Sequence, residues 1–107
     1  MSNTGFKQDL LRDIESYALG ETPSAFEMLR APKIENWSTQ VLRVGKEFKL
    51  VARGQVHRHP EHHDGEDIST VAALWFDRHG RFVRTYHRLY ALGEPAGDEI
   101  PINAVDL

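Results

Sequence analysis

Apolar residues at helical spacing occupy the N-terminal part of the chain. Between residues 5 and 19 they lie four, one, three and three positions apart, as in an amphipathic helix: Phe6, Leu10, Leu11, Ile14 and Tyr17. Gly20 suits the position just past the end of such a helix. Ser24 and Glu27 form the S-x-x-E pattern of a helix start, so we expect a second, short helix that ends near Ala31, before Pro32.

After Pro32 the pattern changes to an alternation of apolar and polar residues. Residues 37–44 and 48–57 are rich in Val, Leu and aromatic side chains and flank Gly45-Lys46-Glu47, which predicts a hairpin. Residues 59–67 contain a proline and a glycine and no large apolar side chain. This segment is therefore predicted to be an exposed loop.

A second hairpin is predicted over residues 68–76 and 81–92. Its turn, Asp77-Arg78-His79-Gly80, begins with Asp and ends with Gly, as does a type I turn followed by a glycine of positive φ. Two helices followed by four strands favour an α+β fold in which the helices pack on one face of the sheet.

The predicted organisation is a single domain over residues 1–107. Two N-terminal helices, at about residues 5–31, pack on a four-stranded antiparallel meander sheet at about residues 36–92, and a tail covers residues 93–107. A chain of this length has room for one hydrophobic core but not for two.

Composition narrows the classes of protein to which the chain can belong. The absence of cysteine excludes disulfides, thiolate metal sites and cysteine nucleophiles. No apolar run approaches the roughly 20 residues of a membrane span, and the N-terminus lacks a signal-peptide pattern, so we expect a cytoplasmic protein that does not contact membranes. The formal net charge is −3, yet residues 30–58 carry +5 and residues 68–93 carry +3. The predicted strands are thus basic and their flanks acidic.

Aromatic and arginine residues alternate along the last predicted strand. Because side chains of a strand alternate between its faces, every second residue shares one face. The residues on this face are Phe82, Arg84, Tyr86, Arg88 and Tyr90, and Trp75 joins them from across the hairpin. The opposite face carries residues better suited to a core beneath helices: Ala72, Leu74, Val83, Thr85 and Leu89. We therefore expect the aromatic and arginine residues on the open side of the sheet.

Three interpretations of this open face remain. Aromatic and arginine side chains dominate protein interfaces, so the face could bind a partner protein or a second copy of the chain in a homodimer. The same side chains could stack on bases and neutralise phosphates of a nucleic acid, on a patch widened by Arg43, Lys49 and Arg53. In the third interpretation, the arginine stems only shield aromatic rings from water.

Histidines cluster in the predicted loop between the hairpins. Four of the six histidines lie within seven residues and beside four carboxylates. These histidines are His57, His59, His62 and His63. Imidazole and carboxylate ligate divalent transition metals such as Zn or Ni, which makes a metal site one hypothesis. A loop that responds to pH is the second, because histidines titrate between roughly pH 5 and 8. The third is a solvated polar loop with no bound group.

Sequence motifs of common enzyme classes are absent. The chain contains no G-x-S-x-G elbow, no Walker loop, no H-E-x-x-H and no glycine-rich dinucleotide turn. We therefore expect a binding module rather than an enzyme, and no obligatory cofactor.

The second half of the chain also resembles a known family. The residues that carry the resemblance are His59-Pro60, Asp64-Gly65, Ile68-Ser69-Thr70, Asp77, Gly80, Arg84-Thr85, Arg88, Tyr90, Leu92-Gly93 and Pro95. In them the chain is similar to an uncharacterised family of short alphaproteobacterial proteins ending in R-T-x-x-R-x-Y-x-L-G-x-P. That family has no established activity, so the resemblance implies a shared fold and no function. His57, His62 and His63 are not part of its pattern.

The leading hypothesis is a small cytoplasmic bacterial accessory protein that binds a partner protein through the open sheet face. The alternatives are a metal- or pH-responsive module at the histidine loop, a nucleic-acid-binding module, and a small inhibitor or immunity protein of a mobile element.

Overall fold

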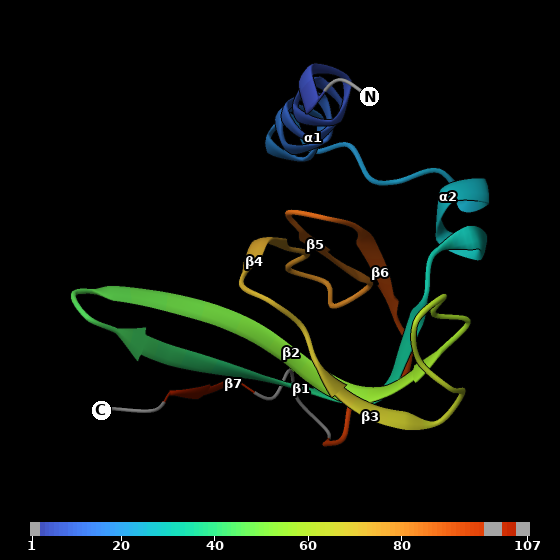
Figure 1. The fold of residues 1–107 in the computed structure, drawn as a ribbon, viewed down its shortest axis with the longest axis vertical. Helices are drawn as coiled ribbons and strands as arrows, with labels where there is room; N and C mark the ends of the chain where they lie inside the picture. Colours follow the sequence, from blue (N-terminus) through green and yellow to red (C-terminus); the bar gives the residue numbers. More distant parts are fainter. Residues whose placement is uncertain (1–2, 98–101, 105–107) are drawn as a thin grey trace.

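The computed structural model describes residues 3–97 and 102–104 of the chain. Two helices precede all the strands, so the α+β class is confirmed (Figure 1). The elements are α1 (Asn3–Ala18), α2 (Ala25–Arg30), β1 (Lys33–Val44), β2 (Glu47–His57), β3 (Glu66–Ser69), β4 (Ala73–Phe76), β5 (Phe82–Thr85), β6 (Leu89–Leu92) and β7 (Ile102–Ala104). Neither of the helices described has the length and apolar character needed to cross a membrane. The predicted tail includes β7, and its residues 98–101 and 105–107 lie outside the described part.

Both helices begin or end with the local chemistry that the sequence predicts. After α1, Gly20 takes φ +91° and donates its N–H to the carbonyl of Tyr17. The N–H of Glu21 donates to the carbonyl of Ser16. This pair of bonds is a Schellman motif, which requires a residue with positive φ. At the start of α2 the predicted capping box is confirmed, because Ser24 and Glu27 exchange side-chain-to-backbone hydrogen bonds of 3.1 Å.

The predicted four-stranded antiparallel meander is wrong in its strand count and in its pairing. The described strands run in the order β3-β2-β1-β6-β5-β4, and β7 pairs with β1 outside this series. Strand β1 is parallel to both β6 and β7, so the sheet is mixed. In Figure 1 the β4-β5-β6 half stands above the β1–β2 hairpin and curves back over it.

Each strand of the predicted second hairpin is in fact two shorter strands. The first breaks after Ser69, where the N–H of Thr70 donates to the carbonyl of Ala52 and the Thr70 hydroxyl accepts the N–H of Ala52. The second breaks at a turn that Thr85 closes, because its N–H donates to the carbonyl of Arg88 and its hydroxyl accepts the N–H of Arg88. Such hydroxyl-to-backbone bonds compete with strand pairing.

The first hairpin is confirmed, and it is longer than predicted. Val44 pairs with Glu47, so the turn consists of two residues, and its first, Gly45, has φ +64°. Strand β1 bulges at Asn36, which has φ +54°. Gly54 crosses this bulge so closely that a Cβ added to it would lie 2.6 Å from the Ile34 side chain. This close approach explains why the position is a glycine.

Part of the face predicted to be open is instead covered by α1. The Tyr17 ring packs against Phe82 at 5.0 Å and against Trp75 at 5.9 Å between centroids. Arg84 points to the same helix, where Asp13 lies 3.7 Å from its guanidinium. Of the opposite face, predicted to meet the helices, Val83 instead packs on the other half of the sheet, whereas Leu74 is 48% exposed. The core there also includes Tyr90, predicted on the open face, and consists of Ile34, Trp37, Ala52, Val56, Val83, Tyr90 and Leu92.

The predicted Asp77–Gly80 turn is confirmed by its hydrogen bonds. Gly80 has φ +69° and donates its N–H to the Asp77 carbonyl at 2.8 Å. The buried Asp77 carboxylate accepts the backbone N–H and the side-chain Nε–H of Arg81, at 3.0 and 2.9 Å. Beyond the turn, Phe76 pairs with Val83.

Replacing Asp77 tests the contribution of this turn to stability. Burial would raise the pKa of the Asp77 carboxyl, but hydrogen bonds from Arg81 outweigh it and hold the pKa below its ordinary value. Its contribution is therefore complete above about pH 4 and is lost as the pH falls through the folded-state pKa. We expect Asp77→Ala to lower the free energy of unfolding by about 1 to 3 kcal/mol at pH 7, and by less near pH 3.

Urea unfolding at the two pH values measures both effects. Asp67→Ala removes an exposed carboxylate of β3 and is the control. Equal losses in the two variants, or an Asp77→Ala loss that does not change with pH, would contradict this account of the turn.

Candidate functional site

Residues from the two sequence features meet in one pocket of about 420 Å³. The loop after β2 forms one wall, β3 and the segment after it a second, and the β5–β6 turn a third. The lining residues are His59, Glu61, His62, Ile68, Ser69, Thr70, Val71, Thr85, His87, Arg88 and Tyr90. Its volume is at the lower end of the range usual for ligand sites.

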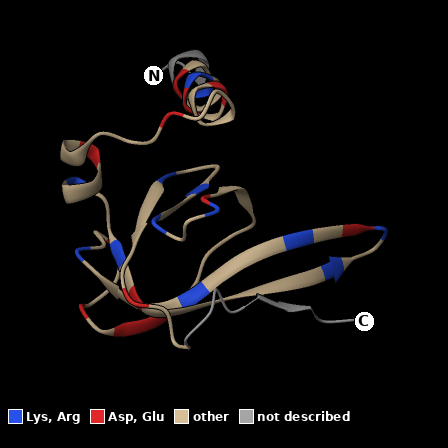
Figure 2. Ribbon diagram, turned by 180° about the vertical axis from the view of Figure 1, so that it is seen from behind, with Lys and Arg blue, Asp and Glu red and all other residues tan. Residues whose placement is uncertain are grey.

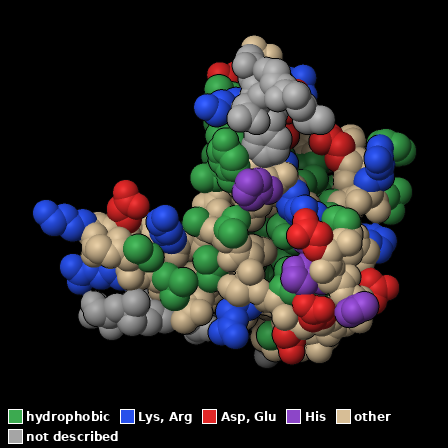
Figure 3. Space-filling model, in the orientation of Figure 1, with side chains coloured by type: hydrophobic (Ala, Val, Ile, Leu, Met, Phe, Trp, Pro, Cys, Tyr) green, Lys and Arg blue, Asp and Glu red, His purple; other side chains and the backbone are tan. Residues whose placement is uncertain are grey.

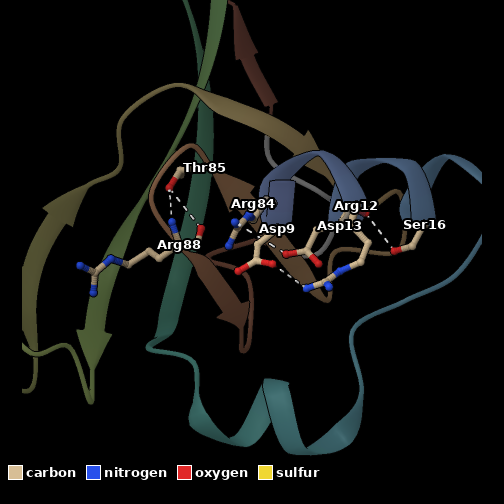
Figure 4. Close-up of polar contacts among 7 residues, drawn as sticks. All are labelled: Asp9, Arg12, Asp13, Ser16, Arg84, Thr85 and Arg88. Atoms are coloured by element: carbon tan, nitrogen blue, oxygen red, sulfur yellow. Dashed lines mark hydrogen bonds and ion pairs between the residues drawn. The ribbon is translucent and has the colours of Figure 1, made fainter. Parts of the chain in front are cut away.

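The predicted aromatic and arginine face is divided among three environments. Phe82 and Arg84 are buried beneath α1, at 2% and 9% exposure. Tyr86 is exposed at the turn, and Arg88 and Tyr90 line the pocket. Figure 4 shows the Arg84 side chain directed towards Asp13 of α1, whereas that of Arg88 extends away from this helix. The predicted single face is therefore wrong, because the turn at residues 86–87 interrupts the strand.

Arg84 has a structural environment rather than that of a binding residue. Its side chain is 11% exposed, and its Nε has no hydrogen-bond partner among the described residues. Burial raises the pKa of Asp13, and the nearby Arg84 charge lowers it. A buried guanidinium needs such a carboxylate, so Asp13 compensates the charge of Arg84 where α1 meets the sheet.

The histidine loop is ordered by its own hydrogen bonds. The Asp64 carboxylate accepts the N–H of Arg58 at 2.8 Å, and Nδ1 of His62 lies 2.6 Å from a carboxylate oxygen of Glu66. Figure 3 shows histidine and acidic side chains gathered over this part of the surface. Of the four predicted metal ligands, only His59 and His62 have rings in contact, at 4.5 Å between centroids. Within residues 3–97 and 102–104 no three His, Asp or Glu side chains are placed to hold a metal ion.

His59 is held in one tautomer by its neighbours. Its Nδ1 accepts the backbone N–H of Glu61 at 3.0 Å, so the proton of the neutral ring is on Nε2, which lies 3.2 Å from the Tyr90 hydroxyl. Burial lowers the pKa of His59, the charges of Arg88 and His62 lower it further, and those of Glu61 and Glu66 act in the opposite direction. Because Tyr90 accepts from His59, its own hydroxyl proton is available to a ligand.

Arg88 is the cation at the pocket that a ligand could engage most directly. Its guanidinium lies 3.4 Å from Glu61, a carboxylate that is 73% exposed. Exposed pairs of this kind contribute at most about 1 kcal/mol, so an incoming anion can compete with Glu61 at little cost. With the hydroxyls of Tyr90 and Ser69 nearby, the pocket offers the donors that a carboxylate or phosphate requires.

Apolar side chains lie beside this polar pocket. Val71, in its wall, is 57% exposed, and Tyr86, between the lining residues Thr85 and His87, is 41% exposed. Sequence reasoning missed Val71 and Thr85 as site residues because it placed both inside continuous strands. The signal that was available for Thr85 is its hydroxyl, since Thr favours turns in which it bonds to the backbone.

Comparisons with known proteins give no assignment. No protein-family model, no curated protein and no solved structure matches the chain. The family resemblance therefore stays a prediction. Several of the residues that carry it line the pocket: His59, Ser69, Thr70, Thr85, Arg88 and Tyr90.

The pH dependence of stability tests the environment assigned to His59. Because its folded-state pKa is depressed, its contribution to stability is present above about pH 6.5 and is lost as the pH falls through the folded pKa. We expect His59→Gln to lose less stability than wild type between pH 7 and pH 5 in urea unfolding. His63→Gln, at an exposed position of the same loop, should follow wild type. Parallel pH profiles for all three proteins would refute the assignment.

Proposed function

We propose that the protein is a small binding module that recognises an acidic side chain of a partner protein at this pocket. Arg88 supplies the charge, and Tyr86 and Tyr90 supply aromatic contact and a hydroxyl. These three residues belong to the face that the sequence suggested for protein binding. Trp75, Phe82 and Arg84 contribute to the fold instead, because they pack beneath α1.

The observation that carries the proposal is the state of Arg88. Its side chain is 29% exposed and lines a pocket, and among the described residues its one ion pair is a 3.4 Å contact to an exposed carboxylate. An arginine partly shielded from water gains more from a second carboxylate than a fully exposed one does. Arginine and tyrosine are also the residues that most often dominate binding energy at protein interfaces.

The apolar surroundings favour a protein over a free small anion. Val71 and Tyr86 are exposed at the pocket and next to it, and would remain so around a small ligand. A partner protein would cover these side chains and exclude water from Arg88, which strengthens the charged contact.

Charge reversal at Arg88 tests the proposal. We expect Arg88→Glu to weaken binding of the partner at least tenfold, because it replaces an attractive contact with a repulsive one. Affinity capture from a nuclease-treated bacterial lysate, quantified by mass spectrometry, identifies the candidates. Calorimetry with the purified candidate then measures the change in affinity.

Arg78→Glu is the matched control, because it makes the same charge change at an exposed arginine of the Asp77–Gly80 turn. It should bind as wild type does. Equal capture by wild type and Arg88→Glu, or equal loss in both variants, would exclude Arg88 as the recognition residue.

A further inference from the structure

The β1–β2 hairpin projects as an arm from the rest of the protein (Figure 1). Its base is flanked by other strands: β6 pairs with β1 at Lys33 and Ile34, and β3 pairs with β2 as far as Arg53. Strand β7 pairs with β1 only as far as Val41. Among the described residues, positions 42–49 therefore pair only with each other and form a free two-stranded ribbon.

The arm is basic, although the chain as a whole is acidic. Arg43, Lys46 and Lys49 lie on its free segment 42–49 with a single acid, Glu47. Within the described part of the chain none of these three cations forms an ion pair, and the Arg43 Nε donates only to the carbonyl of Gly45. Figure 2 shows basic residues along the arm and most acidic ones elsewhere. These cations are free to meet an external polyanion.

The register distributes these cations over both faces of the ribbon and its tip. Arg43 pairs with Phe48 and therefore lies on one face, while Lys49 pairs with Leu42 on the other, because successive residues alternate between faces. Lys46 lies in the turn at the tip. A ribbon charged in this way can contact two phosphate chains that pass on either side of it.

We propose that this arm binds double-helical DNA by entering its major groove. That groove admits a two-stranded β-ribbon and is bordered by two phosphate backbones, which the cations on the two faces would reach. Each face also carries an exposed apolar side chain, Phe48 beside Arg43 and Val44 on the face of Lys49, at 68% and 54% exposure, and thymine methyl groups in the groove offer apolar contact.

A single-stranded nucleic acid fits the arm less well. Proteins that bind single strands stack successive bases on several aromatic rings. Phe48 is the single aromatic residue of the segment 42–49. An acidic protein segment would satisfy the cations on one face only, so the duplex is the ligand that uses all of them.

The net negative charge of the chain does not oppose this binding. The protein is 36 Å long, whereas the Debye length at physiological ionic strength is about 8 Å. The acidic loop after β2 lies at the other end of the molecule from the tip of the arm (Figure 1). Its charges are therefore screened from a ligand at the tip.

Fluorescence anisotropy with a labelled duplex of about 20 base pairs tests the proposal directly, over roughly 50 to 200 mM salt. We expect the affinity of the wild-type protein to fall steeply with salt. In Lys46→Gln/Lys49→Gln the affinity at the lowest salt should fall at least tenfold, and the slope of log K against log salt should decrease by about 1.8, the value for two phosphate contacts. Phe48→Ala should weaken binding and leave the slope unchanged.

Lys7→Gln/Arg78→Gln is the control, since it removes two exposed charges outside the arm. It should bind the duplex as wild type does, and so should Arg88→Glu, which separates this site from the pocket. Thermal unfolding verifies that each variant is folded. The proposal is overturned by no duplex binding at the lowest salt, by equal weakening in the two double variants, or by tighter binding of a single strand of the same length.

Discussion

The parallel pairing of β1 with β6 is the interaction on which the rest of the structure depends. Lys33 pairs with Ala91 and Ile34 with Leu92, and the N–H of Gly93 extends the ladder to the carbonyl of Ile34. The buried Trp37 adds a bond from its indole N–H to the Gly93 carbonyl at 2.9 Å. This seam folds the β4-β5-β6 half over the first hairpin, and it creates both the apolar core and the pocket.

Features set by neighbouring residues could be predicted from the sequence, while features set by the seam could not. Gly20, the Ser24 capping box and the Asp77–Gly80 turn are each specified within a few positions of the chain. Which face of a strand is covered depends instead on what packs there. Phe82 and Val83 are adjacent and both buried, because α1 covers one side of β5 and the other half of the sheet covers the opposite side. Alternation carries no signal for a strand that is buried on both faces.

The candidate site likewise could be predicted only in its separate parts, because its residues come together through the tertiary fold. His59 came from the histidine cluster, and Arg88 and Tyr90 from the arginine strand, as separate hypotheses. Nothing local indicates that His59 and Tyr90 are hydrogen-bonded, since the loop after β2 reaches β6 only after the sheet has closed. Thr85 likewise looks like an ordinary strand residue until its hydroxyl closes the turn.

The position of β6 in the chain also determines when the protein can fold. Ala91 and Leu92 are synthesised long after Lys33 and Ile34, so a nascent chain carries an unpaired edge of β1 until β6 has emerged from the ribosome. Contacts between residues so far apart in sequence form slowly, because the intervening chain must first lose its conformational freedom. During that interval the long, partly apolar β1–β2 hairpin is exposed to pairing with other chains. Its arginines and lysines then act as protection against aggregation in the unfinished molecule.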